Sequence, residues 1–154
     1  MKAKTIALTI SLVFVSVVAL GFQNNPQLGT WKLNEAKSKF AGKARNQTVV
    51  IEAAGDQIKV TVDGVDESGA AAHNEWTGKF DGKDYPITGD STADARYYRM
   101  IDKNTWEIAN KKGGKTVLTG RIVISADGKT RTVTTNGTDS QGQKVSNVAV
   151  YDKQ

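Results

Sequence analysis

The stretch Gly29-Thr30-Trp31-Lys32-Leu33 decides the fold, because it opens the first of many short strand-like runs. Apolar and polar residues alternate within these runs, and Gly, Asp and Asn residues separate one run from the next up to the end of the chain. Alternation with a period of two residues is typical of half-buried strands, and the separating residues are those that turns prefer. The sequence therefore predicts an all-β domain.

A segment with the pattern of a signal peptide precedes this stretch. Lys2 and Lys4 come before an apolar and small-residue run that extends from residue 5 to residue 20. We expect residues 1–23 to be cleaved and residues 24–154 to form the mature, exported protein, in the periplasm or outside the cell. The alternative is a signal anchor, since the run approaches the length of a short membrane-spanning helix.

No basic cluster follows the run, which disfavours retention in the membrane. Position 22 is Phe, where a lipid anchor would need Cys. We therefore expect no stable membrane anchor after cleavage. The whole chain lacks cysteine, which excludes disulfides and cysteine-bound zinc.

The expected mature chain has a length typical of one domain with one core. Loss of Lys2 and Lys4 lowers the formal net charge from +5 to +3, which bears on solubility more than on partners. The basic residues between 37 and 45 have only Phe40 among them for stacking on bases, so no nucleic-acid partner is expected.

The spacing of the turns predicts about ten strands, with a range of eight to ten. They are residues 29–33, 47–54, 58–63, 71–80, 85–88, 96–101, 105–110, 116–125, 130–135 and 145–152. Asp-Gly pairs between such runs favour tight hairpins, and residues 34–42 allow at most one short helix. A meander of this length either stacks as two sheets or closes on itself, and closure removes exposed edges. We predict a single antiparallel up-and-down β-barrel.

The composition bears on what fills the barrel. Between residues 24 and 154 the chain has only three Leu residues, at 28, 33 and 118, whereas Val, Thr, Ala and Gly dominate the strands. Small inward side chains leave space for a ligand, so the sequence favours an internal cavity. A tight barrel filled by β-branched side chains is the alternative.

The two ends of the domain resemble those of the calycins, the lipocalins and fatty-acid-binding proteins. Gly29 and Trp31 match the Gly-x-Trp motif of their first strand, and residues 150–153 (Val-Tyr-Asp-Lys) resemble the Val-Tyr-Glu-Lys close of the fatty-acid-binding group. The chain is most similar to uncharacterised, exported, lipocalin-like bacterial proteins. The resemblance implies that Trp31 plugs the closed end of the barrel, with Arg121 or Arg131 packed across it.

The chain also departs from that family. Fatty-acid-binding proteins hold a carboxylate with an Arg two residues before the terminal Tyr, and Ala149 stands at this position. The anionic anchor is therefore expected to be missing. These proteins also place two helices after the first strand, where this chain has only residues 34–42.

The resemblance suggests which residues line a cavity. If Tyr151 points inward as in the family, strand parity places Asn147 on the same face, and both supply polar contacts to a ligand. Further candidates are Tyr97, Trp76 and Arg121, for which an ordinary pair on the outside of the barrel is the alternative.

Catalytic and metal-binding patterns are weak in this sequence. His73 is the single histidine, which supports neither a multi-histidine metal site nor a Ser-His-Asp triad. We predict a non-catalytic binding protein for a small, mainly apolar ligand, with no cofactor and no metal. The alternatives are a filled-barrel envelope or interaction protein that acts through its surface, and an enzyme built in the barrel mouth.

Overall fold

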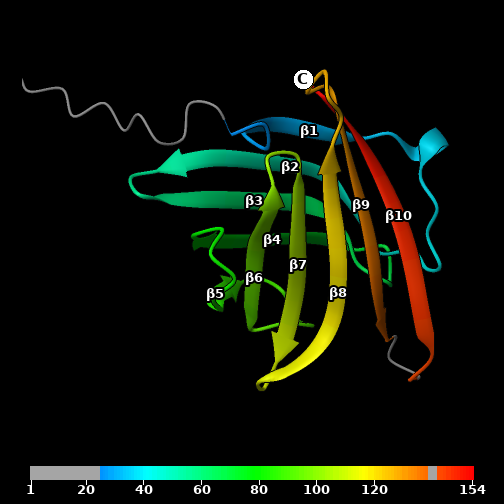
Figure 1. Ribbon diagram of the computed structural model, residues 1–154. Helices are drawn as coiled ribbons and strands as arrows, with labels where there is room; N and C mark the ends of the chain where they lie inside the picture. The colour runs from blue at the N-terminus through cyan, green and yellow to red at the C-terminus, as the bar shows by residue number, and fades with distance from the viewer. Residues whose placement is uncertain (1–24, 139–141) are drawn as a thin grey trace, which may run out of the picture.

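Ten antiparallel strands close into a barrel in the computed structural model (Figure 1). The structure describes residues 25–138 and 142–154, so the predicted signal peptide, residues 1–23, lies outside the described residues. The strands are β1 (Gly29–Leu33), β2 (Arg45–Ala54), β3 (Gln57–Val65), β4 (Ala71–Gly78), β5 (Tyr85–Thr88), β6 (Ala95–Asp102), β7 (Thr105–Lys112), β8 (Lys115–Ile124), β9 (Thr130–Thr138) and β10 (Lys144–Lys153). The predicted fold class is confirmed.

A single 3-10 turn, η1 (Glu35–Lys37), is the only helix among the described residues, and it falls within the predicted range 34–42. In this part of the chain no helix has the length and apolar character needed to cross a membrane.

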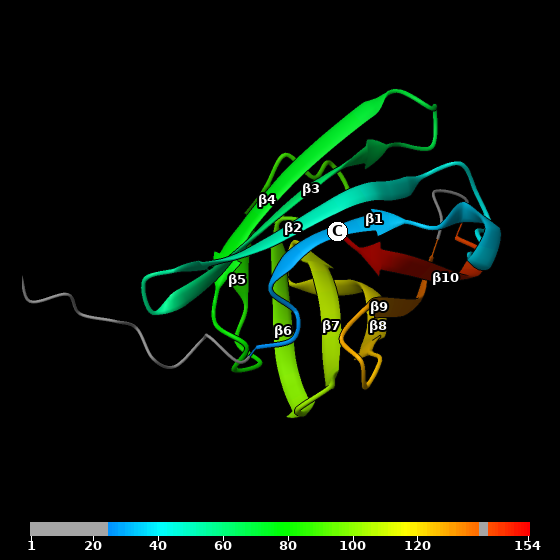
Figure 2. The same ribbon diagram turned by 90° about the horizontal axis from the view of Figure 1, so that it is seen from above.

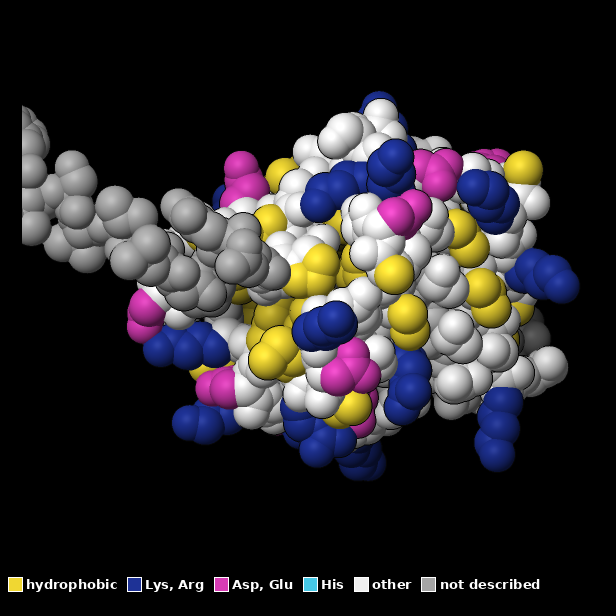
Figure 3. All heavy atoms as spheres, turned by 45° about the horizontal axis from the view of Figure 1, so that its top comes forward, with side chains coloured by type: hydrophobic (Ala, Val, Ile, Leu, Met, Phe, Trp, Pro, Cys, Tyr) yellow, Lys and Arg dark blue, Asp and Glu magenta, His cyan; other side chains and the backbone are white. Residues whose placement is uncertain are grey.

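Charged side chains of both signs are spread over the face shown in Figure 3.

The short strand β1 completes the ring. It lies between β2 and β10, where Trp31 pairs with Val49 on one side and with Lys153 on the other (Figure 2). Each remaining strand pairs with its neighbour in sequence. The first and last strands are thereby joined, and neither leaves an open edge.

The strand β5 forms the weakest part of the wall. It contributes only two residue pairs to β4 and two to β6, whereas β9 and β10 share nine. A strand of four residues can make few ladder hydrogen bonds.

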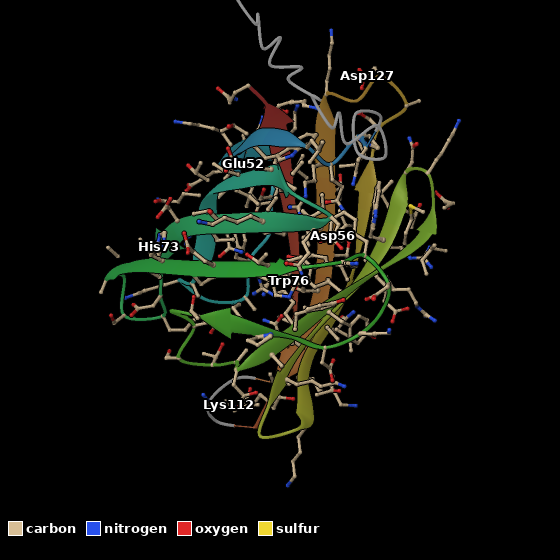
Figure 4. All side chains as sticks on the ribbon, turned by 90° about the vertical axis from the view of Figure 1, so that its left-hand side faces the viewer. Glu52, Asp56, His73, Trp76, Lys112 and Asp127 are labelled. Atoms are coloured by element: carbon tan, nitrogen blue, oxygen red, sulfur yellow. The ribbon has the colours of Figure 1, made fainter. Side chains whose placement is uncertain are left out.

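The two ends of the barrel differ in what surrounds them. The turn between β8 and β9, with Asp127, lies at one end, and the turn between β7 and β8, next to Lys112, lies at the opposite end (Figure 4). We call the first the closed end and the second the mouth. Trp31 is fully buried, and its Nε1 donates a hydrogen bond to the carbonyl oxygen of Gln27, also fully buried, at 2.8 Å.

Large aromatic and branched side chains fill the core. The aromatic rings of Trp76 and Tyr98 pack edge to face with centroids 4.7 Å apart, and Phe80 contacts both Tyr98 and Trp106. Fully or almost fully buried side chains also include Val49, Ile51, Ile58, Val60, Ile122 and Ile124. These residues come from alternate positions of their strands, as the period of two predicts.

One glycine is required by this packing. A Cβ on Gly78 would lie 2.5 Å from Cγ of Tyr85 and 2.7 Å from Cζ2 of Trp76. The absence of a side chain at this position lets the Tyr85 ring approach the Trp76 ring edge-on, at 5.8 Å.

Replacement of Trp31 tests the importance of the plug. We expect Trp31→Ala to lower the free energy of unfolding by about 3 to 5 kcal/mol, because it leaves a cavity and an unpaired Gln27 carbonyl. Equilibrium unfolding in urea measures this change. The control Val123→Ala, at a strand position that is 40% exposed, should stay within about 0.5 kcal/mol of the wild type. Similar losses for both variants would contradict the assignment.

Candidate functional site

A cavity of about 90 Å³ lies inside the barrel, between the filled closed end and the mouth. Its lining comprises Asn46, Val49, Val62, Arg96, Tyr98, Ile108, Asn110, Leu118, Arg131, Val133, Thr135 and Tyr151. The barrel thus combines the two predicted interiors, a filled core and a cavity. The volume is smaller than the cavity of about 150 Å³ that holds benzene in an engineered protein. It suits a group of only a few atoms.

Arg131 lies at the deep end of this cavity. It stands near the start of β9, directly opposite Tyr151 in the register with β10. Its guanidinium carbon lies 5.4 Å from the centre of the Tyr151 ring, and its Nε donates a hydrogen bond of 3.3 Å to Oε1 of Gln27. The residue is only 4% exposed.

The charge of Arg131 has no counterion among the residues that the structure describes. Among residues 25–138 and 142–154, no carboxylate lies within ion-pair distance of it, and its one hydrogen bond joins a neutral amide. Burial lowers the pKa of the guanidinium below its usual value, and the nearby positive charge of Arg96 acts in the same direction. Arginine nevertheless stays protonated in proteins. The cavity therefore contains an uncompensated positive charge.

Two tyrosine hydroxyl groups lie beside this charge. Tyr98 is 3% exposed and Tyr151 2%, and neither hydroxyl has a hydrogen-bond partner in the described part of the chain. Burial raises the pKa of Tyr151 to about 12, although the positive charge of Arg131 opposes this rise. The Tyr151 hydroxyl is therefore protonated at neutral pH. The hydroxyls of both tyrosines can donate hydrogen bonds to a ligand.

A second arginine, Arg96, faces the cavity nearer the mouth, and each of its three side-chain nitrogens has a polar neighbour. Its Nε donates to Oδ1 of Asn110 at 2.7 Å, and Nη1 donates to Oδ1 of Asn74 at 3.5 Å. Its Nη2 lies 3.6 Å from Oδ2 of Asp90. Three elements thus hold this guanidinium in place, and Asp90 neutralises its charge.

The structure places the predicted site residues in different environments. Tyr151 lines the cavity. Asn147 lies on the same face of β10 and is half-buried, but its Oδ1 accepts a hydrogen bond from the backbone N–H of Ala41 at 2.8 Å, which ties the connection between β1 and β2 to β10. Trp76 belongs to the core, and its Nε1 donates to the carbonyl oxygen of Arg96 at 2.9 Å.

Two predicted site residues lie outside the cavity. The hydroxyl of Tyr97 donates to Oε1 of Glu107 at 2.5 Å on the outer face of the barrel. Arg121 is exposed on β8, and it stands opposite Glu107 in the register with β7. Both residues therefore lie in cross-strand pairs on the outside of the barrel, which was the alternative given for them in the sequence.

One expectation drawn from the resemblance needs correction. The cation packed over Trp31 is the ammonium of Lys153, at 5.1 Å from the ring centre, and not Arg121 or Arg131. Ala149 stands two residues before Tyr151, and the guanidinium over the Tyr151 ring is that of Arg131 on the neighbouring strand.

Sequence reasoning missed Arg131 as a cavity residue, although the sequence contains a signal for it. The predicted turn at residues 139–143 is centred on residue 141. In an antiparallel hairpin, reflection through this centre pairs Arg131 with Tyr151, and paired residues point to the same face. An inward Tyr151 therefore implies an inward Arg131.

No protein-family model matches the chain, and no curated protein matches it either. What the structure shows is a closed ten-stranded antiparallel barrel, which is consistent with a calycin-like fold.

His73 lies on β4, away from the cavity lining, and its Nδ1 is 2.7 Å from Oδ1 of Asp63 on an exposed face (Figure 4). Within the described ranges, no group of three His, Cys, Asp or Glu side chains is placed to hold a metal ion.

Replacement of Arg131 separates a structural role from a binding role. A buried charge without a counterion is expensive, so we expect Arg131→Met to keep or raise the free energy of unfolding, by up to about 2 kcal/mol. Urea unfolding without any added ligand measures this free energy. Arg121→Met is the control for the loss of an exposed arginine. A loss of more than about 1 kcal/mol in the Arg131 variant alone would show that the residue is kept for stability.

The raised pKa of Tyr151 predicts a loss of stability at high pH. Above pH 10 the unfolded chain releases this proton while the folded barrel retains it up to about pH 12, so unfolding becomes easier across this window. The loss amounts to about 2 to 3 kcal/mol for this group. We therefore expect the free energy of unfolding of Tyr151→Phe, measured in urea between pH 9 and pH 12, to fall by that much less than that of the wild type. An unchanged decline would contradict the assignment.

Proposed function

We propose that this chain is an exported, non-catalytic binding protein of lipocalin-like type, whose barrel holds a small molecule with an apolar part and one anionic group. The observation that carries the proposal is Arg131, a charged side chain that lines the cavity without a counterion in the described chain. An anion placed against it would compensate a charge that the protein itself leaves unpaired.

The groups around Arg131 support recognition of an anion. A guanidinium binds carboxylate and phosphate oxygens with paired hydrogen bonds, which are about twice as strong as bonds between neutral groups. The hydroxyls of Tyr98 and Tyr151 supply two further donors beside it. A ligand with one carboxylate fits this set of donors.

The remaining lining supports an apolar part of limited size. Aliphatic side chains contribute five of the residues around the cavity, namely Val49, Val62, Ile108, Leu118 and Val133. A volume of about 90 Å³ holds only a short chain, with any longer part directed toward the mouth. We therefore propose short monocarboxylates as the ligand class.

Binding rather than catalysis is proposed because of the kinds of side chain present. The described residues that line the cavity are arginines, tyrosines, asparagines, a threonine and aliphatic residues, which orient a ligand by hydrogen bonding. Export remains part of the proposal, and it rests on the sequence of residues 1–23.

Exposed lysines near the mouth agree with an anionic ligand. Lys112, labelled in Figure 4, and Lys115 flank the turn between β7 and β8. Lys144 begins β10 at the same end of the barrel, because it pairs with the end of β9 next to the start of β8. Positive charge around an opening raises the rate at which anions arrive, and salt weakens the effect.

Calorimetric titration of the purified mature protein tests the proposal. The probes are acetate, propionate and butyrate, with butyramide as a neutral counterpart of butyrate. We expect at least one carboxylate to bind saturably and butyramide to bind at least tenfold more weakly. We expect Arg131→Met to weaken carboxylate binding by about 10- to 100-fold, since a hydrogen bond to a charged group contributes about 1.5 to 3 kcal/mol.

The matched control is Arg121→Met, which removes an exposed arginine from the outer face and should bind like the wild type. Absence of saturable binding by all the carboxylates, or equal affinity in the Arg131 variant, would overturn the proposal.

A further inference from the structure

We propose that Asp90 sets the charge of the ligand: by neutralising Arg96 from a loop at the mouth, it makes the cavity accept a monoanion and reject a dianion. This inference rests on the function proposed above. It adds a specificity determinant outside the residues that line the cavity.

The carboxylate of Asp90 is held in place by its own loop. The residue lies between β5 and β6, and its side chain is 14% exposed, against 7% for that of Arg96. Its Oδ1 accepts hydrogen bonds from the backbone N–H of Thr92 at 2.9 Å and from the Thr92 hydroxyl at 2.7 Å. Oδ2 is left to face Arg96.

The loop itself is fixed on both sides. Gly89 adopts a φ of +79°, and a Cβ there would lie 2.3 Å from the carbonyl oxygen of His73, so the chain passes directly against β4. At the other side, the backbone N–H of Asp94 donates to the carbonyl oxygen of Lys111 at 2.9 Å, and Oδ2 of Asp94 accepts from the N–H of Gly113 at 2.8 Å. Asp90 is therefore positioned before any ligand arrives.

The charges that face the cavity leave room for one negative charge. Two guanidinium groups line it, those of Arg96 and Arg131, and Asp90 is the one carboxylate paired with either of them in the described chain. Their sum is a single positive charge. A second negative charge on a ligand would lie unpaired in a low-dielectric space and would be repelled by Asp90.

Replacement of Asp90 by Asn changes this sum with little change in shape. Arg96 keeps its bond of 2.7 Å to Asn110 and its contact with Asn74, so the guanidinium stays at the cavity wall. The cavity then faces two uncompensated positive charges, which suits a dianion.

The experiment compares two ligands of similar shape, succinate and monomethyl succinate, by calorimetric titration at pH 7.5 and low salt. The wild type should bind the monoester at least tenfold more tightly than the dianion. In Asp90→Asn the affinity for succinate should rise at least tenfold, and the preference for the monoester should shrink or reverse. The control Asp84→Asn removes an exposed carboxylate that pairs with Lys111, and it should keep the wild-type preference.

The outcomes distinguish the two proposals. If the wild type binds neither the monoester nor any monocarboxylate, the proposed function fails and this inference fails with it. If the monoester binds but Asp90→Asn keeps the wild-type ratio, only the role of Asp90 is overturned. If a thermal unfolding scan shows that Asp90→Asn does not fold, the affinities of the wild type for the two ligands decide. A tenfold preference for the monoester supports the inference, and equal affinities overturn it.

Discussion

The pairing of β1 with both β2 and β10 is the constraint on which the rest of the structure depends. Five residues around Trp31 join the two ends of the chain and turn an open meander into a ring. Once the ring is closed, every strand must send alternate side chains into one enclosed space. The burial of Trp31 and its bond to Gln27 fix the closed end of that space.

The enclosed space is divided by chemistry. Toward the closed end, tryptophan, isoleucine and valine side chains form one buried cluster. Farther toward the mouth, arginine, asparagine and tyrosine take over the inward positions. One of these arginines is neutralised and bound on three sides, whereas the other, within the described part of the chain, has an amide and an aromatic ring as its partners. The unpaired guanidinium distinguishes this part of the interior from a packed core, because it can bind an anionic group.

Most of the fold was predictable from the sequence, because hairpins depend on local signals. Turn residues at Asp81-Gly82, Gly113-Gly114 and Asp127-Gly128 fix where strands end, and β5 was predicted with its observed bounds. The site was harder to predict, because it depends on which side chains face inward on distant strands. The inward direction of Tyr151 came from the family resemblance, and Tyr151 lines the cavity. Arg121 was not excluded, since its outward direction follows only from the register with β7. The contact between Asp90 and Arg96 involves a loop, which has no periodicity from which to predict it.

Because β5 is so short, local opening of the barrel wall is expected there. With two residue pairs to each neighbour, this is the segment that we expect to separate first, while the other nine strands keep their ladders. Local openings of this kind cost much less than global unfolding. They would let solvent and small solutes reach the cavity through the side wall as well as the mouth, close to the loop that carries Asp90, without disturbing the plug at the far end.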